Sequence, residues 1–179
     1  MAASKPKHKA GSASAGSPDN KTGYAPPPPA QPGEFAKARI AIVATRWNVD
    51  IVDRLTAGAS ACLRDWGVPE KRIMLLRAPG AYEMPLACKL LLERKDIDGV
   101  VALGAVIRGD TPHFDFVAGE CARGLLDVQL ATGKPLGFGV LTVNTVAQAV
   151  ERAQPGPINK GYEAAAAMLE MLRLRKELA

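Results

Sequence analysis

His113 is the side chain best suited to transfer protons near neutral pH, because it is the single histidine between residue 37 and the C-terminus and imidazoles titrate in that range. It follows Asp110 and Thr111, ahead of an expected helix. The first backbone N–H groups of a helix have no partners within the helix and can bind anions. The segment therefore predicts a site that combines proton transfer with binding of an anionic group.

Aromatic and polar side chains stand at two further places. Trp47 and Asn48 follow an apolar, β-branched run, and Tyr82 and Glu83 follow the turn "APG". An indole ring can stack on a flat heterocycle. Together with the segment around His113, these residues predict a site that binds a planar, polar molecule.

Each candidate also has an ordinary structural explanation. A tryptophan after a first strand is often a core residue, and a lone histidine is often packed or simply at the surface. A glutamate at the start of a helix interacts favourably with the helix dipole without any function. Arg152 and Lys160, on either side of a Pro/Gly turn, are each typical of solvated charges. No single residue decides the function.

Four short apolar runs predict strands, and helical spacing of apolar residues separates them. The strands are expected within 39–45, 72–77, 98–107 and 134–142, and the helices over 51–66, 83–94, 114–132, 145–153 and 160–176. Asn48 and Asp50 supply N-cap chemistry for the first helix, and Gly67 stands where a C-cap glycine belongs. The runs show no alternation of apolar and polar residues, so all four strands are expected to be buried on both faces.

Strands that alternate with helices predict an α/β fold, a doubly wound parallel sheet of about four strands with helices on both faces. Ligands bind beyond the carboxyl ends of the strands in such sheets. The segments that contain His113, Trp47 and Glu83 all follow strands, so they are expected on one rim.

Several common classes of protein are excluded by missing motifs. No GxGxxG follows the first strand and no GxxxxGK[ST] occurs, which argues against a dinucleotide-binding fold and a P-loop hydrolase. The strand ends lack the acidic residues of a receiver domain and the hydroxyl-rich phosphate loop of a flavodoxin. A single histidine in this stretch excludes a metal site built on paired histidines.

Composition limits the partners and the compartment. The net charge is +5, but charges of both signs are interspersed and form no basic stripe with aromatics, so we expect no nucleic-acid binding. No apolar run is long enough to span a membrane, and no secretory signal precedes the folded part. Three widely spaced cysteines fit reduced thiols, and we expect a cytoplasmic protein.

The first 36 residues differ from the rest of the chain. They hold half of the 14 prolines and almost no large aliphatic side chains. Such a stretch cannot offset the entropy of ordering itself. We expect a disordered Pro/Ala/Ser/Lys-rich tail over 1–36 and one folded domain over 37–179.

Taken together, the motifs resemble the 6,7-dimethyl-8-ribityllumazine synthase family, which acts in riboflavin biosynthesis. They occur in the family's order and cover essentially all of residues 38–175: "RWN" (46–48), "APGAYEMP" (78–85), "LGAVIRGDTPHFDFV" (103–117), "FGVLT" (138–142), "QAVERA" (148–153) and "NKGYEAA" (159–165). The resemblance implies a three-layer, flavodoxin-like fold. It also implies condensation of 5-amino-6-(D-ribitylamino)uracil with 3,4-dihydroxy-2-butanone 4-phosphate, with release of phosphate and water, and without a metal or redox cofactor.

The resemblance also implies roles for individual residues. It makes His113 the proton-transfer residue and assigns the phosphate to Asp110, Thr111 and Arg152. Trp47 stands where the family has a pyrimidine-stacking phenylalanine, beside Asn48. The remaining substrate contacts that it implies are Ala81, Tyr82 and Glu83 for the ribityl chain, Ala105, Val106 and Ile107 for the pyrimidine edge, and Phe138 and Lys160, with Phe138 supplied by a neighbouring subunit.

The chain departs from the family pattern at a few positions. Trp47 and Tyr82 replace phenylalanines, and Pro155 and Pro157 stand in the turn before Lys160. The family forms pentamers, some of which assemble into shells of 60 subunits, so we expect a pentameric homo-oligomer, with a shell and an association with riboflavin synthase as further expectations. The alternative is a non-catalytic ligand binder or shell-forming structural homologue that retains only the fold.

Overall fold

A computed structural model describes residues 27–156 and 158–179 of the 179-residue chain. Its centre is a four-stranded parallel sheet with the strand order β2-β1-β3-β4. The strands are β1 (Ile40–Thr45), β2 (Ile73–Ala78), β3 (Gly99–Ile107) and β4 (Leu136–Val143). The predicted parallel sheet of about four strands is confirmed.

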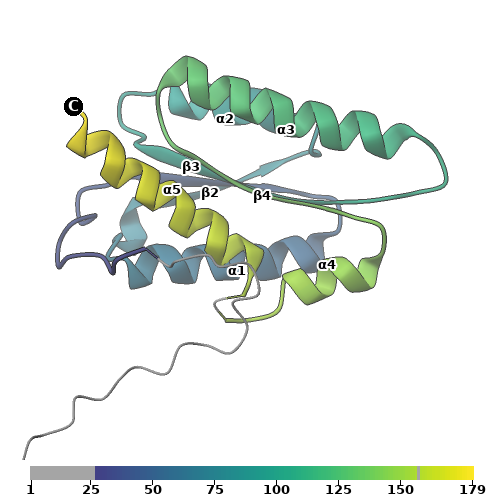
Figure 1. The fold of residues 1–179 in the computed structure, drawn as a ribbon, viewed down its shortest axis with the longest axis horizontal. Helices are drawn as coiled ribbons and strands as arrows, with labels where there is room; N and C mark the ends of the chain where they lie inside the picture. The colour runs from purple at the N-terminus through teal and green to yellow at the C-terminus, as the bar shows by residue number, and fades with distance from the viewer. Residues whose placement is uncertain (1–26, 157) are drawn as a thin grey trace, which may run out of the picture.

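Helices cover both faces of the sheet, so the fold has three layers (Figure 1). They are α1 (Val49–Asp65), α2 (Met84–Leu92), α3 (His113–Thr132), α4 (Val146–Arg152) and α5 (Lys160–Glu177), with a short 3₁₀ helix η1 (Glu70–Arg72). Side chains of α1, α4 and α5 form one apolar cluster with the sheet, and those of α2 and α3 form a second cluster on the other face. Alternate residues of β1 enter the two clusters, because successive side chains of a strand point to opposite faces.

The outer strands differ from the prediction that every strand is buried on both faces. β1 is buried along its whole length, but Leu75 in β2 is 50% exposed and Phe138 in β4 is 47% exposed. Both residues belong to edge strands. Strand order depends on long-range pairing, so an apolar run by itself does not show which strands lie at an edge.

The predictions for the two ends of α1 are confirmed at Gly67 and confirmed only in position at Asn48. Gly67 has φ +85° and ends the helix in a Schellman motif, with hydrogen bonds from Gly67 N to Arg64 O and from Val68 N to Leu63 O. Asn48 occupies the N-cap position, but its side chain makes no capping hydrogen bond. It donates instead to the carbonyl oxygen of Ala105 in β3.

The segment ahead of β1 packs on the domain. Phe35 is completely buried and lies 5.9 Å, centroid to centroid, from the ring of Trp66. At least one residue of the stretch over 1–36, Phe35, is therefore packed on the folded domain. Residues 1–26 of the expected tail lie outside the described residues, and no helix of the described residues is long and apolar enough to cross a membrane.

Candidate active site

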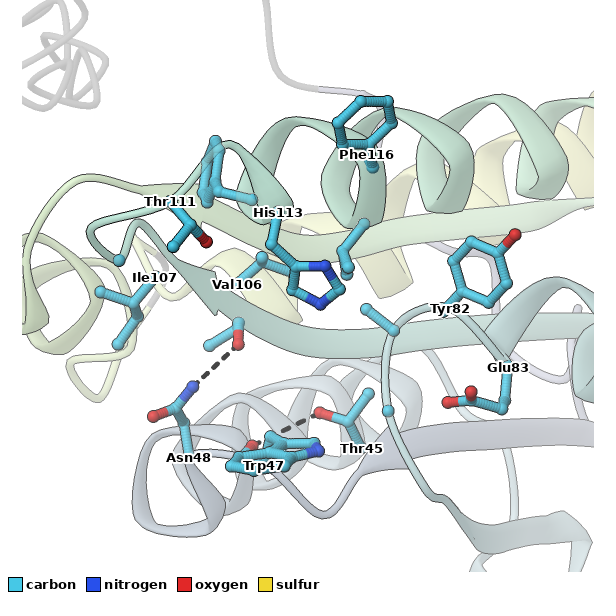
Figure 2. Close-up of a pocket in the computed structure, with 16 residues that line it drawn as sticks. Thr45, Trp47, Asn48, Tyr82, Glu83, Val106, Ile107, Thr111, His113 and Phe116 are labelled. Atoms are coloured by element: carbon cyan, nitrogen blue, oxygen red, sulfur yellow. Dashed lines mark hydrogen bonds between the residues drawn. The ribbon is translucent and has the colours of Figure 1, made fainter.

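A pocket of about 620 Å³ lies at the carboxyl ends of β1 and β3 (Figure 2). The loops after β1, β2 and β3 form its walls together with the start of α3. This is the rim where an open parallel sheet binds ligands. Ten of the predicted site residues line it: Trp47, Asn48, Ala81, Tyr82, Glu83, Ala105, Val106, Ile107, Thr111 and His113.

His113 is the first residue of α3 and its side chain is exposed. Figure 2 shows its ring pointing from α3 into the pocket. Val106 of β3 lies beside the ring, and Trp47 lies across the pocket from it. An imidazole placed in this way can exchange protons with a bound ligand and with solvent.

Aromatic side chains give the pocket its flat, apolar walls. Trp47 is 73% exposed, Tyr82 is 63% exposed and Phe116 is 67% exposed, and all three line the pocket. Large aromatic side chains that are left open to solvent in one place mark a binding surface. A planar heterocycle can stack on such rings.

The exit of β3 supplies the polar groups. β1 pairs with β3 only as far as Ala44 and Leu103, whereas β3 continues alongside β4 to Ile107. Beyond Leu103, the side of β3 that faced β1 therefore has no strand partner. Its backbone N–H and C=O groups can hydrogen-bond to the edge of a ligand.

Glu83 brings a carboxylate into the pocket beside Trp47. A Cβ atom added at Gly80 would lie 3.1 Å from Oε2 of Glu83 and 3.4 Å from Cδ1 of Trp47. Gly80 therefore lies close to both side chains, and a larger residue at this position would press against the Glu83 carboxylate and the Trp47 indole. Glu83 occupies the N-cap position of α2 but makes no capping hydrogen bond there, which leaves its carboxylate free to bind a polar ligand.

Arg108 does not line the pocket. Its guanidinium donates to both carboxylate oxygens of Asp115, at 2.7 and 3.2 Å, and lies 4.2 Å from the ring centroid of Phe114. The hydrogen bond from Arg108 lowers the pKa of the Asp115 carboxyl below its ordinary value. Among the described residues that line the pocket there is no lysine or arginine, so an anion bound here would depend on backbone N–H groups.

The predicted cationic residues lie elsewhere. A second pocket of about 580 Å³ follows the free edge of β4 between α3 and α5, and it is lined by Phe138, Arg152 and Lys160. Arg152 donates to the carbonyl oxygen of Gln148 at 3.0 Å, and Lys160 binds both carboxylate oxygens of Glu163 at 2.6 and 2.8 Å.

The predicted site residues are therefore divided between two pockets of one chain. Asp110 is exposed in the turn before α3 and lines neither pocket, although its neighbours Gly109 and Thr111 line the first. Arg152 does not join Thr111 within the chain, as a phosphate site formed by one subunit would require.

Six further residues line the first pocket and were not among the predicted site residues: Thr45, Gly80, Gly109, Phe114, Phe116 and Val117. Phe116 and Val117 follow His113 at spacings of three and four, which places them on the same face of a helix. From that spacing, Phe116 and Val117 could have been predicted to line the pocket beside His113. No group of three or more histidine, cysteine, aspartate or glutamate side chains in the described part of the chain is arranged to hold a metal ion.

Comparisons with known proteins agree on one family. Residues 37–176 match the family model described as 6,7-dimethyl-8-ribityllumazine synthase. A protein of that name from Nitratidesulfovibrio vulgaris (strain DP4) is 51% identical over 140 residues, which cover 78% of this chain and 90% of the relative. Relatives with the same name from Desulfovibrio desulfuricans and Halorhodospira halophila are 49% and 50% identical, covering 78% and 79% of this chain and 90% of each relative.

Proposed function

The chain belongs to the 6,7-dimethyl-8-ribityllumazine synthase family, and from this membership we infer that it catalyses the condensation of 5-amino-6-(D-ribitylamino)uracil with 3,4-dihydroxy-2-butanone 4-phosphate in riboflavin biosynthesis. The product is 6,7-dimethyl-8-ribityllumazine, and phosphate and water are released. The observation that carries this proposal is the position of His113 inside a pocket walled by Trp47 and Tyr82.

The pocket offers a place for each part of the pyrimidine substrate. The ring stacks on Trp47, and its polar edge binds the backbone of Ala105–Ile107, where β3 has lost its neighbour. The ribityl chain lies along Ala81–Glu83, and the carboxylate of Glu83 accepts hydrogen bonds from the ribityl hydroxyl groups. Together these contacts leave the amine of the substrate near His113.

The reaction requires several proton transfers. The amine attacks the ketone, and loss of water gives an imine. Loss of a proton from the adjacent carbon then drives elimination of phosphate, and closure of the second ring releases another water. We assign these proton transfers to His113, because its imidazole points into the pocket.

The phosphate group requires a cation that the first pocket lacks. Backbone N–H groups at the start of α3, next to Thr111, supply one part of an anion site. Arg152 from the second pocket of a neighbouring subunit supplies the other part, because an arginine can bind phosphate through two N–H groups. Phe138 and Lys160 of that neighbour complete the wall.

A homo-oligomer is therefore part of the proposal. Large apolar side chains stand exposed on α2 and α3, including Leu86, Leu90, Leu126 and Leu130. Exposed apolar surface of this extent is typical of a subunit interface. We propose that the subunits form a pentamer, that pentamers assemble into a shell of 60 subunits, and that this assembly contacts riboflavin synthase. We also propose a cytoplasmic location, which suits the free cysteines Cys62, Cys88 and Cys121.

The test mixes the purified protein with both substrates and follows the lumazine absorbance and the released phosphate together. We expect both to appear in equal amounts and much faster than in the spontaneous reaction. A non-catalytic homologue would bind the pyrimidine, seen as quenching of tryptophan fluorescence, without accelerating either signal. That outcome would overturn the proposed activity.

A further inference from the structure

Asn48 bridges the two strands that form the pocket. β1 and β3 stop pairing after Ala44 and Leu103, and the chain of β1 turns away toward α1. Beyond that point the Nδ2 atom of Asn48 donates to the carbonyl oxygen of Ala105 at 2.9 Å, a hydrogen bond drawn in Figure 2. The amide of Asn48 thus takes the place that the backbone of β1 has left.

This hydrogen bond acts where β3 begins to serve as a ligand surface. Along a strand, the N–H and C=O groups of one residue point to one side and those of the next residue to the other. The carbonyl of Ala105 points toward the β1 side, as its bond to Asn48 shows. The next groups on that side belong to Ile107, which lines the open pocket.

The backbone of Asn48 is specialised as well. Its φ of +54° and ψ of +45° place it in the left-handed region, and it is the one residue other than glycine with a positive φ in the described part of the chain. Asparagine tolerates this conformation better than most residues. The carbonyl oxygen of Asn48 also accepts hydrogen bonds from Ile51 N and Val52 N, both at 3.0 Å, so the turn is tied to the first turn of α1.

These constraints act on Trp47, the residue directly before Asn48. Its indole is largely exposed and forms one wall of the pocket. The weak contact from Thr45 Oγ1 to Trp47 O, at 3.5 Å, adds little restraint. The backbone around Trp47 is held by the hydrogen bonds of its two neighbours, from Arg46 N to Ala78 O on one side and those of Asn48 on the other.

We propose that Asn48 is a positioning residue for the condensation. It ties the turn that carries Trp47 to the exit of β3. In this way it sets the distance between the indole that stacks on the pyrimidine and the β3 backbone that binds the edge of the pyrimidine. This inference rests on the proposed function and differs from a direct substrate contact by Asn48. Its amide nitrogen is already engaged with Ala105.

The test uses two variants that are compatible with a positive φ. Asn48→Asp keeps the shape of the side chain but cannot donate, and Asn48→Gly removes the side chain and relieves the backbone. The control is Asp50→Asn, a change of the same size on the first turn of α1. All three are made with Trp66→Phe, which leaves Trp47 as the single tryptophan of the chain.

Time-resolved fluorescence anisotropy of Trp47 is the first measurement and needs no substrate. We expect faster local motion of the indole in Asn48→Asp and Asn48→Gly, and no change in Asp50→Asn. Unchanged motion in both Asn48 variants would overturn the proposal. This result stands whether or not the protein condenses the two substrates, so it separates failure of the proposal from failure of the proposed function.

Steady-state kinetics is the second measurement. We expect the KM for the aminopyrimidine to rise about tenfold in both Asn48 variants, because the two binding surfaces lose their fixed separation. The KM for the butanone phosphate should stay within about twofold, because its anion site does not depend on this bridge. An equal rise in both constants would indicate a general structural role and would also overturn the proposal.

Discussion

Arg173 near the end of α5 binds Glu34, which lies ahead of β1, through two hydrogen bonds of 2.6 and 3.0 Å. The two side chains are only 20% and 18% exposed. The same guanidinium lies 5.3 Å from the ring of Trp66 and donates to the carbonyl oxygen of Pro28. The pair therefore fastens the segment that contains the buried Phe35 to the last helix.

The first prediction concerns the stability that this pair contributes. The hydrogen bond from Arg173 holds the pKa of the Glu34 carboxyl below its ordinary value of 4.5, so the contribution is present above that pH and is lost as the pH falls through the folded-state pKa. Glu34→Gln should lower the free energy of unfolding by about 1–2 kcal/mol at pH 7. The difference from the wild type should shrink toward pH 3, in urea unfolding at a fixed protein concentration.

The matched control for this prediction is Glu70→Gln. Glu70 pairs with Arg64 at 3.4 Å, and both side chains are more than half exposed. Exposed pairs contribute about 0–1 kcal/mol, so this variant should stay close to the wild type. An equal loss in both variants, or a loss in Glu34→Gln that does not depend on pH, would contradict the assignment.

A second prediction concerns proton transfer by His113. His113→Ala should lower kcat by a factor of about 10²–10⁴, because it removes the side chain that we propose as the acid and base. His113 is exposed and lies at the start of α3, so the circular dichroism and the oligomeric mass should not change. The control is His8→Ala, at the other histidine of the chain, which should keep full activity. A kcat near the wild-type value for His113→Ala would remove His113 from the mechanism.

A third prediction concerns the phosphate. Arg152→Ala should raise the KM for the butanone phosphate about ten- to a hundredfold, since hydrogen bonds to a charged group contribute about 1.5–3 kcal/mol. The KM for the aminopyrimidine should change little. Arg152→Lys keeps the charge without the paired N–H groups and should give an intermediate value. If the KM for the phosphate substrate is unchanged in Arg152→Ala, this arginine is not in the anion site.

The cysteines give a fourth prediction. Burial raises the pKa of the Cys62 and Cys88 thiols to about 12 and that of Cys121 to about 11, so almost no reactive thiolate is present at neutral pH. The folded protein should therefore react with a disulfide reagent far more slowly than a small-molecule thiol does, and three thiols should react at once in denaturant. Rapid modification of the folded protein at pH 8 would show that at least one thiol is accessible.

The limits of prediction from sequence are clearest at Asn48 and β2. The alternation of strands and helices depends on local patterns, so the parallel sheet and the rim that carries His113 followed from the sequence alone. Asn48 was expected to cap α1, because local propensity favours it there. Its side chain instead bonds to Ala105, 57 residues away. Likewise, the apolar run of β2 does not show that this strand lies at an edge, because strand order is fixed by long-range pairing.

The division of the site residues between two pockets was anticipated from the sequence at Phe138, which the resemblance assigns to a neighbouring subunit, but not at Arg152. The motifs placed Thr111 and Arg152 in one phosphate site, but within one chain Thr111 lines the first pocket and Arg152 the second. A sequence gives the types of residue that a reaction requires without showing whether one subunit or two provide them. The division leads to the final prediction.

That prediction is complementation between two defective chains. If each site takes His113 from one subunit and Arg152 from its neighbour, co-expression of His113→Ala and Arg152→Ala chains in equal amounts leaves both residues intact in about one half times one half, or one quarter, of the sites. The chains carry different tags, so that tandem purification isolates mixed assemblies. Activity is measured at a low concentration of butanone phosphate, where each variant alone is nearly inactive.

If both residues instead served the site of their own chain, every site would contain one defect. The mixed assemblies would then be no more active than the average of the two variants, so recovery toward one quarter of wild-type activity distinguishes a shared site from a site within one subunit.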